Sequence, residues 1–392
     1  MTQESAVGRN RRHWVVMLEA GRQRWGGDLR RINLFRRLAE ITEATTLNGW
    51  GHGSIRARYG RLRTLPTPLA LFGRRARPLL ASAEQLPPAT IRTAARVLDP
   101  AAVAVYDDPV AQARDLGIVL PAERLAYFAA RKLANVNAFR WHVVPTASFA
   151  EHIGLDMSRV IVAGNGTDVG RILPGEWPED PAIGMISGAA PGRGVETLIE
   201  AARLIHEEVP ELRLLLWLAA TGDASQDYLD QIRAATAGQR WIEISTADYG
   251  DLTHALRQAT VLATPHPPGD YHDIALPVKL LDGMAAGRPQ VVTPRTEPRA
   301  LIERHGVGIV TRGERPEDLA ASLRELLLDP GRAQAMGRRA RLVAETTYDW
   351  AVVGQRVAEA ILEREGVADQ WLAENAGGST DQSSYSPPLA RE

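Results

Sequence analysis

A lysine at the start of a predicted helix is the first residue whose type and position suggest chemistry. Residues 275–289, ALPVKLLDGMAAGRP, read as a helix with Pro277 at its first position and Lys279 in its first turn. The chain has 46 basic residues, but only Lys132 and Lys279 are lysines. The helix dipole is already positive at this end, so a cation there costs up to about 1 kcal/mol. A bound anion would neutralise both charges, and we therefore predict a phosphate beside Lys279.

Asp282 lies three residues after Lys279, so the two side chains would share one face of that helix. They could form a local ion pair, which is worth about 0.2–0.5 kcal/mol. Alternatively, the Asp282 carboxylate could accept hydrogen bonds from a ribose diol, as acidic side chains do in nucleotide sites. The spacing alone allows both interpretations.

A second candidate site lies in SGAAPGRGVETLIEA, residues 187–201. A predicted strand ends at Gly188, a loop of small residues follows, and Arg193 stands just before a predicted helix. Glycine lets a ligand approach the backbone, and the start of a helix offers unpaired amides and a positive dipole. We predict a phosphate cradle here, although it is not a P-loop because no G-K-[ST] follows. The alternative is an ordinary strand–helix turn with a solvated arginine.

Acidic residues are candidates for acceptor or sugar contacts. Asp107 and Asp108 end the predicted strand AAVAVYDDP, residues 101–109. They could instead cap a helix or turn before Pro109. The stretch HPPGDYHD, residues 266–273, holds two histidines and two aspartates, but their spacing fits no helical ligand pattern. We predict no metal, and the chain contains no zinc, H-E-x-x-H or G-x-S-x-G motif.

Two runs of alternating predicted strands and helices must position these residues. The first run starts with a strand at 13–20, and the second starts with AIGMISG at 182–188. Such alternation predicts two doubly wound, Rossmann-like α/β domains facing a central cleft. Ligands of such sheets bind beyond the carboxyl ends of the strands. One cleft should therefore be lined by the loops that follow Gly188, Thr246, Pro265 and Pro294.

Composition limits the class of protein and its partners. A chain of 392 residues suits two domains, and the absence of cysteine rules out disulfides and cysteine-ligated zinc. No apolar run approaches the roughly 18 residues that cross a bilayer, and we expect no signal peptide and a cytoplasmic location. Residues 1–80 hold sixteen arginines against five acidic residues. This charge suits a membrane surface, a phosphorylated partner or nucleic acid, and a solvated arginine surface is the alternative.

Several segments together resemble one family. The stretch VLATPHPPGDYHDIALPVKLLDGMAAGRPQVVTP, residues 261–294, resembles the C-terminal half of GT-B glycosyltransferases of the retaining, GT4-like group 1 type. NGTD at 165–168 is similar to that family's NGVD turn, and GAAPGRGVETLIEAA at 188–202 to its glycine-containing loop. WGGDLRRINLFRRLAE, residues 25–40, is similar to its Gly-Gly loop and first helix. The resemblance covers residues 140–364 well, 13–40 weakly and 41–135 hardly at all.

The resemblance implies a nucleoside-diphosphate sugar as donor and no metal or other cofactor. Arg193 stands where the family has its diphosphate-binding lysine. Lys279 would lie beside the diphosphate or the sugar, and Asp282 replaces the family's ribose-binding glutamate. The other implied donor contacts are Gly26, Gly27, Gly188, Thr246, His266 and Leu276. Cations and helix ends would stabilise the leaving diphosphate in such a site.

Two positions depart from the family pattern. Ala189 stands where the family has a diphosphate-binding arginine, and Ile274 replaces the first glutamate of its E-x7-E motif. Asp273 is one position off that register and joins Asp107 and Asp108 as a catalytic candidate. In the family, the departing phosphate is thought to take the proton of the acceptor. Ala189 and Ile274 keep open the alternative of a non-catalytic nucleotide-binding protein that supports a partner transferase. A nicotinamide-dependent oxidoreductase is a third hypothesis.

The resemblance also implies a domain plan. Residues 1–172 would form the acceptor domain, 173–346 the donor domain, and a final helix at 347–366 would pack back on the first. Residues 375–392 are predicted to be a disordered tail because they are polar and rich in Ser, Pro and Gly. We expect sugar transfer with retention to an unidentified acceptor: lipid-linked, polysaccharide or small molecule. The basic acceptor domain could contact the inner face of the membrane, and no nucleic acid is expected.

Overall fold

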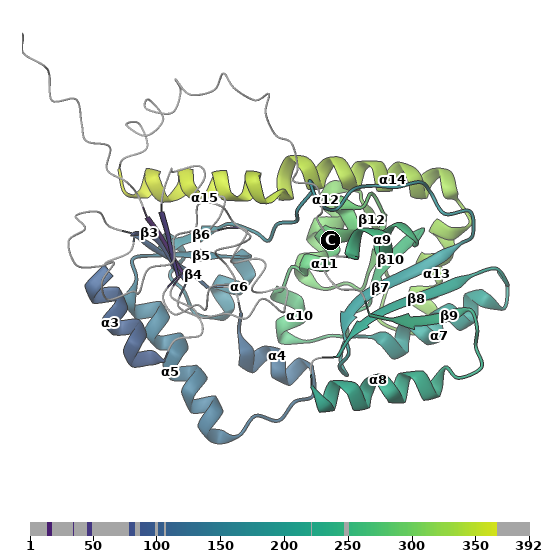
Figure 1. Ribbon diagram of the computed structural model, residues 1–392, viewed down its shortest axis with the longest axis horizontal. Helices are drawn as coiled ribbons and strands as arrows, with labels where there is room; N and C mark the ends of the chain where they lie inside the picture. Colours follow the sequence, from purple (N-terminus) through teal and green to yellow (C-terminus); the bar gives the residue numbers. More distant parts are fainter. Residues whose placement is uncertain are drawn as a thin grey trace, which may run out of the picture.

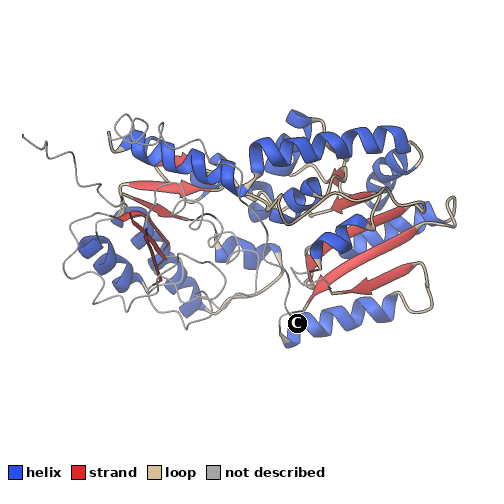
Figure 2. Ribbon diagram, turned by 45° about the horizontal axis from the view of Figure 1, so that its top comes forward, coloured by secondary structure: helices blue, strands red, loops and turns tan. Residues whose placement is uncertain are grey.

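Two parallel β-sheets with flanking helices make up the part of the chain that the structure describes (Figure 1, Figure 2). This structure is a computed structural model. It describes residues 14–17, 34, 45–48, 78–82, 87–98, 101–105, 107–220, 222–246 and 251–366. The predictions for Gly26, Gly27 and the tail at 375–392 lie outside these residues, as does most of the helix expected from Asp28.

The first sheet has six strands in the order β2-β1-β3-β4-β5-β6, and all neighbours are parallel. Its strands are β1 Trp14–Met17, β2 Thr45–Asn48, β3 Pro78–Ser82, β4 Ala102–Ala104, β5 Trp141–Val144 and β6 Val160–Val162. The helices within this stretch are α3 Pro88–Leu98, α4 Pro109–Asp115, α5 Ala122–Ala138 and α6 Ala147–His152, with a 3-10 turn at Met157–Arg159. Uninterrupted apolar strands such as β4 are buried on both faces, as parallel sheets require.

The second sheet also has six parallel strands, in the order β12-β11-β10-β7-β8-β9. Its strands are β7 Ala182–Gly188, β8 Arg213–Ala219, β9 Ile242–Ser245, β10 Val261–Thr264, β11 Gln290–Val292 and β12 Gly308–Val310. The strand order reverses between β7 and β10. In a doubly wound sheet, this reversal is where ligands bind.

Helices cover both faces of the second sheet. They are α7 Val195–His206, α8 Asp223–Ala235, α9 Leu252–Arg257, α10 Asp270–Ile274, α11 Val278–Ala285, α12 Thr296–His305, α13 Pro316–Leu327 and α14 Pro330–Val343, followed by a π-helical turn at Ala344–Tyr348. In α7, Val195, Leu198, Ile199 and Ala202 recur at helical spacing and are all buried. Burying one such branched side chain contributes about 1.5–3 kcal/mol. This spacing is why the segment forms a helix against the sheet.

The last helix, α15 (Trp350–Arg364), returns to the first sheet, above which it lies in Figure 1. Its residues Trp350, Val353, Val357 and Ile361 share a core cluster with residues of the first sheet. Below, first domain means the first sheet with α3–α6 and α15, and second domain means the second sheet with α7–α14. Residues 163–181 join the two sheets and contain no helix or strand. In that connection, a Cβ on Gly166 would lie 2.6 Å from the Trp350 ring, so only glycine fits there.

Most predicted elements are present. Strands β2, β3 and β12 and helices α3, α5, α10 and α12 were not predicted, and α4 was expected only as the alternative role of Asp107 and Asp108. In α5, only Ala134 and Asn135 are buried, and the apolar residues Leu125, Phe128 and Val136 line a cavity. Helix α10 has 5 residues and follows a proline-rich loop. Pro277 is the N-cap of α11 rather than its first helical residue. Within the described ranges, no helix is long and apolar enough to cross a membrane.

Candidate functional site

Basic side chains gather beyond the point where the order of the second sheet reverses. Arg193 follows β7, His266 follows β10, His272 lies in α10, and Lys279 lies in the first turn of α11. Burial is the main cause of the lowered pKa of His266, His272 and Lys279, and the positive charge of Arg193 lowers each pKa further. The four side chains are therefore within electrostatic reach of one another. The structure thus brings together residues that the sequence placed in separate loops.

Lys279 remains accessible to water, but the surrounding protein lowers its pKa to about 7. The protein atoms packed around the ammonium replace part of its water shell and are the main cause of the lowered pKa, the charge of Arg193 adds to it, and the charge of Asp282 opposes it. Among the described residues, no carboxylate forms an ion pair with Lys279. The local ion pair with Asp282, which was the alternative interpretation, is therefore not formed. An anion bound here would supply the missing negative charge.

Two stacked histidines lie behind these cations. The ring centroids of His266 and His272 are 4.5 Å apart, with an angle of 23° between the planes. His266 is 8% exposed, and burial lowers its pKa well below the usual value, so its imidazole is neutral at pH 7. Nδ1 of His266 and Nε2 of His272 are buried and have no hydrogen-bond partner in the described structure. Neutral imidazoles can donate to or accept from a polar ligand.

Arg193 is held by glycines that pack against protein. Gly192 and Gly194 have φ of +72° and +76°, which is the left-handed region. A Cβ on Gly194 would lie 1.9 Å from the carbonyl oxygen of Pro265, and one on Gly192 would lie 2.2 Å from that of Asp115. Both glycines therefore pack against protein in the direction of a Cβ, and the approach of a ligand to their backbone amides stays a prediction. The space beside Gly188 is open, since a Cβ there would meet nothing within 4 Å.

The NGTD turn anchors α11 from the side of the first domain. The Thr167 hydroxyl donates to Oδ1 of Asp282 at 2.8 Å, and Nδ2 of Asn165 donates to the carbonyl of Leu276. Asp282 is 4% exposed, and burial raises its pKa to about 7, while Thr167 and Lys279 oppose the rise. One carboxylate oxygen of Asp282 and the carbonyl of Leu276 are therefore already used inside the protein. Their roles toward a donor stay predictions.

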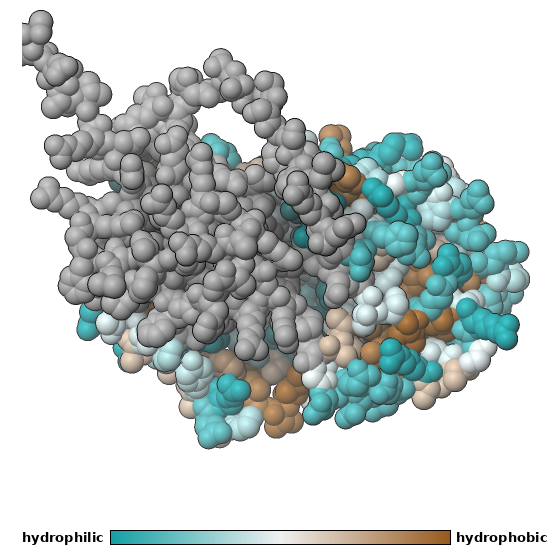
Figure 3. Space-filling model, in the orientation of Figure 1, coloured by the Kyte–Doolittle hydropathy of each residue, from teal (hydrophilic) through white to brown (hydrophobic). Residues whose placement is uncertain are grey.

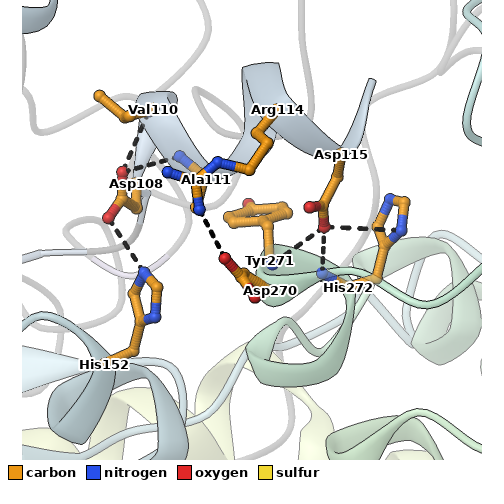
Figure 4. A network of polar contacts seen from close by, with 9 residues as sticks. All are labelled: Asp108, Val110, Ala111, Arg114, Asp115, His152, Asp270, Tyr271 and His272. Atoms are coloured by element: carbon orange, nitrogen blue, oxygen red, sulfur yellow. Dashed lines mark hydrogen bonds and ion pairs between the residues drawn. The ribbon is translucent and has the colours of Figure 1, made fainter. Parts of the chain in front are cut away.

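The candidate acids of the first domain also have protein partners, of which Figure 4 shows those of Asp108. Asp108 caps α4: its Oδ1 accepts from the amides of Val110 at 3.0 Å and Ala111 at 3.1 Å. Its Oδ2 lies 3.2 Å from Nε2 of His152. Oδ1 of Asp107 accepts from the Tyr271 hydroxyl at 3.0 Å. The helix-cap interpretation thus holds for Asp108, and no contact in the structure tests a catalytic role for either acid.

Helix α4 of the first domain docks on α10 of the second, and the two helices lie side by side in Figure 1. Oδ2 of Asp115 accepts from the amides of Tyr271 and His272, both at 2.9 Å, and lies 3.6 Å from Nδ1 of His272 (Figure 4). Arg114 and Asp270 form an exposed ion pair at 2.6 Å. The sequence did contain a signal for Asp115, because a carboxylate at the last residue of a helix opposes the helix dipole.

A comparison with known families decides the nature of the second domain. Residues 180–329 match the family model described as Glycosyl transferases group 1. The second domain is a group 1 glycosyltransferase domain. The whole fold is GT-B, as the resemblance implied.

The curated relatives match part of the chain. A GDP-mannose-dependent monoacylated alpha-(1-6)-phosphatidylinositol monomannoside mannosyltransferase of Corynebacterium glutamicum is 27% identical over 219 residues, which are 49% of this chain and 53% of that protein. A D-inositol 3-phosphate glycosyltransferase of Thermobispora bispora is 28% identical over 240 residues, which are 58% of this chain and 48% of that protein. The chain therefore spans about half the length of these relatives.

Solved structures resemble nearly the whole chain. Anabaena Alr3699/HepE in complex with UDP has a TM-score of 0.69 at 13% identity, covering 89% of this chain and 100% of that one. Sucrose-phosphate synthase from Thermosynechococcus elongatus has a TM-score of 0.65 at 11% identity, covering 93% and 100%. At these identities, the likeness concerns the fold alone.

Thr246 and Asp273 are the remaining predicted site residues of the second domain. Thr246 is exposed just beyond β9, an edge strand, and the residues after it at 247–250 lie outside the described residues. Asp273 lies 3.3 Å from Arg295, a buried arginine that also pairs with Glu314. In the described ranges, no three His, Asp or Glu side chains are placed to hold a metal ion. The metal interpretation of residues 266–273 therefore gains no support, and a metal-free reaction stays a prediction.

Proposed function

We propose that this protein is a glycosyltransferase that moves a sugar from a nucleoside-diphosphate sugar to a hydroxyl of a phosphate-bearing acceptor, with retention. The observation that carries the proposal is the group of cations at the reversal of the second sheet. The charge of Arg193 acts on Lys279 there, and among described residues the ammonium of Lys279 forms no ion pair and Nε of Arg193 has no hydrogen-bond partner. A diphosphate supplies the charge that this site lacks.

The comparisons support the donor more directly than the acceptor. The matching relatives are named for GDP-mannose and for inositol phosphates, and a structural neighbour was solved with UDP. An inositol ring that carries a phosphate is common to the named acceptors, and we extend that class to this chain. A basic first domain suits such an anionic acceptor, as well as peripheral contact with the inner face of a membrane.

Each residue has a distinct part in the proposed reaction. Arg193 and Lys279 would hold the diphosphate and stabilise the charge that develops as the bond to the sugar breaks. The neutral His266 would donate or accept a hydrogen bond toward the sugar or the phosphate. The second oxygen of Asp282 would contact the ribose. Because Asp107, Asp108 and Asp273 already have protein partners, the departing phosphate is the group we assign to accept the proton of the acceptor.

Isothermal titration with GDP, UDP and ADP tests the donor site. We expect one of them to bind, and Lys279→Ala to weaken that binding by about 10–100-fold, the worth of one charge-assisted hydrogen bond. Apo stability should not fall, because the lysine is unfavourable without an anion. Arg299→Ala is the matched control: it removes an exposed cation of the same domain that already pairs with Glu303. Equal affinity of the wild type and Lys279→Ala would disprove the phosphate role.

Turnover separates the enzyme from a binding protein. The bound nucleotide identifies the donor, and sugar transfer to inositol phosphates can then be followed by proton NMR of the anomeric centre. Retention predicts a product with the configuration of the donor. Nucleotide binding without transfer or hydrolysis across phosphorylated acceptors would favour the non-catalytic alternative.

A further inference from the structure

A cavity of about 350 Å³ opens in the first domain where β4 ends, between α4 and α5. Its lining residues come from positions 105–153, so it is separate from the basic cluster of the second domain. Most of the lining is apolar and includes Leu125, Phe128, Val136 and Ile153. Cavities of this size and character commonly hold small ligands or parts of larger ones.

The cavity contains one buried polar group that needs a partner. Asn135 is 5% exposed, and its Nδ2 donates to the carbonyl of Arg131 at 3.2 Å. Its Oδ1 is buried and has no hydrogen-bond partner among the described residues. An unpaired buried acceptor is destabilising, and native proteins rarely keep one without a reason. A hydroxyl of a ligand in the cavity would satisfy it.

Two cations lie on the same wall. Arg131 and Lys132, on α5, line the cavity together with Asp107 and Asp108. The Arg131 guanidinium lies 4.9 Å from the centroid of the Phe128 ring, which fixes its position on the apolar wall. Lys132 is exposed. The two cations suit a phosphate at the polar end of the cavity.

Exposed apolar side chains continue from the other end. Leu125, in the first turn of α5, is 41% exposed, and in the preceding connection Ile118 is 51% and Val119 92% exposed. Brown surface lies at the lower edge of Figure 3, in the region of the α4–α5 connection. Leu125 and Asn135 are about 15 Å apart along the helix axis, at 1.5 Å per residue. That span is long enough to separate a polar head from a short chain.

We propose that this cavity binds an amphiphilic acceptor. Its hydroxylated, phosphate-bearing head lies against Asn135, Arg131 and Lys132, and its apolar chain runs along Phe128 and Leu125 toward Val119. The inference rests on the proposed function and chooses a lipid-linked acceptor over a water-soluble inositol phosphate. Asp107 connects the cavity to the donor side, because it accepts a hydrogen bond from Tyr271 of the second domain.

Titration of the full chain with octyl phosphate, below its micelle concentration, tests the site. We expect octyl phosphate to bind at least about tenfold more tightly than inorganic phosphate, since each buried CH₂ group strengthens binding by roughly fourfold. Leu125→Ser should weaken octyl phosphate binding severalfold, and Leu133→Ser should not. Leu133 lies on the same helix and is 61% exposed, but it does not line the cavity. Arg131→Ala should weaken binding of octyl phosphate more than binding of octyl glucoside.

Two outcomes would overturn the proposal: equal affinity for octyl phosphate and inorganic phosphate, or equal losses from Leu125→Ser and Leu133→Ser. Titrating nucleoside diphosphates into the same samples separates this failure from failure of the proposed function. Nucleotide binding without octyl phosphate binding refutes the acceptor site alone. A third arm compares inositol 1-phosphate with its octyl ester as acceptors, and equal kcat/KM for the two would also refute a lipid-linked acceptor.

Discussion

The last turn of α4 and the first turn of α11 both carry a charge at the unfavourable end of a helix. Asp115 is the final residue of α4, where the dipole is negative, and Lys279 lies in the first turn of α11, where it is positive. The Asp115 carboxylate is 3% exposed and accepts from two amides of the other domain. Lys279 is exposed, feels the positive charge of Arg193 and forms no ion pair with Asp282 among the described residues.

A charge at the unfavourable end of a helix therefore has a different environment in each of the two places. At Asp115 the conflict is resolved inside the protein, by amides at the start of α10, and the contact joins the domains. At Lys279 the described residues leave it unresolved, as expected where a ligand brings the opposite charge. Four predictions test this difference.

Gly194→Val should have the largest effect on the free energy of unfolding, because it disrupts the loop that carries Arg193. A left-handed β-branched residue that clashes with Pro265 should lower the free energy of unfolding by about 4 kcal/mol. Urea unfolding measures this. Gly188→Ala is the matched control: the new methyl group meets open space, so stability should change by less than about 0.5 kcal/mol while nucleotide affinity falls. Similar stability losses in both variants would contradict the packing argument.

Asp115→Ala should have the next largest effect on stability, because it removes the contact between α4 and α10. Two amides at the start of α10 lose their acceptor, and we expect a loss of about 2–4 kcal/mol in urea unfolding. The neighbouring Arg114→Ala removes only an exposed ion pair and should cost less than about 1 kcal/mol. If Arg114→Ala were the more damaging change, the domain contact would depend on surface charge instead.

His266 makes stability depend on pH. Its pKa is lowered by burial and then by His272 and the nearby cations, so the unfolded chain binds a proton more readily than the folded protein. Stability should therefore fall as pH drops below about 6.5, by roughly 2 kcal/mol between pH 7 and pH 5 for this one group. Thermal unfolding across this range should show a shallower pH dependence in His266→Gln. Parallel curves would mean that His266 is protonated in the folded state.

Lys279 should give the smallest effect, a pH dependence of nucleotide affinity. With a pKa of about 7, its ammonium form becomes the minor form above that pH, and a diphosphate binds the charged form. Affinity should fall roughly fivefold between pH 7 and pH 8, with proton uptake on binding. Titration in buffers of different ionisation enthalpy measures that uptake. Lys279→Arg stays charged, so its affinity should be flat over this range; a flat wild-type profile would contradict the assignment.

The fold could be predicted where patterns are local. Strand–helix alternation predicted two parallel sheets, because buried parallel strands read as short apolar runs, but it did not predict β2, β3 and β12. Helix α5 was not predicted, although its apolar residues Leu125, Phe128 and Val136 recur at helical spacing and line one cavity. Helix α10 was not predicted because it follows a proline-rich loop, and it contacts a carboxylate of the other domain.

Some residues of the site could likewise be predicted from local sequence, and others could not. Arg193, His266 and Lys279 follow strand ends or begin helices, and these positions are visible in the sequence. The contacts of Asp282 with Thr167 and of Leu276 with Asn165 join residues 115 and 111 positions apart. Their local sequence gives no sign of these contacts, because they exist only after the two sheets are placed together. Asp115 could have been found by the helix-dipole argument that selected Lys279.

The return of α15 to the first sheet sets an order of folding during synthesis. The core of the first domain includes Val353, Val357 and Ile361 of α15, so it is incomplete when β6 has been made. About 190 residues separate Val162 from Trp350, which takes roughly 10–40 s at ordinary rates of translation. The second domain is continuous in sequence and can close during that interval. The half of the molecule that is made first is therefore finished last.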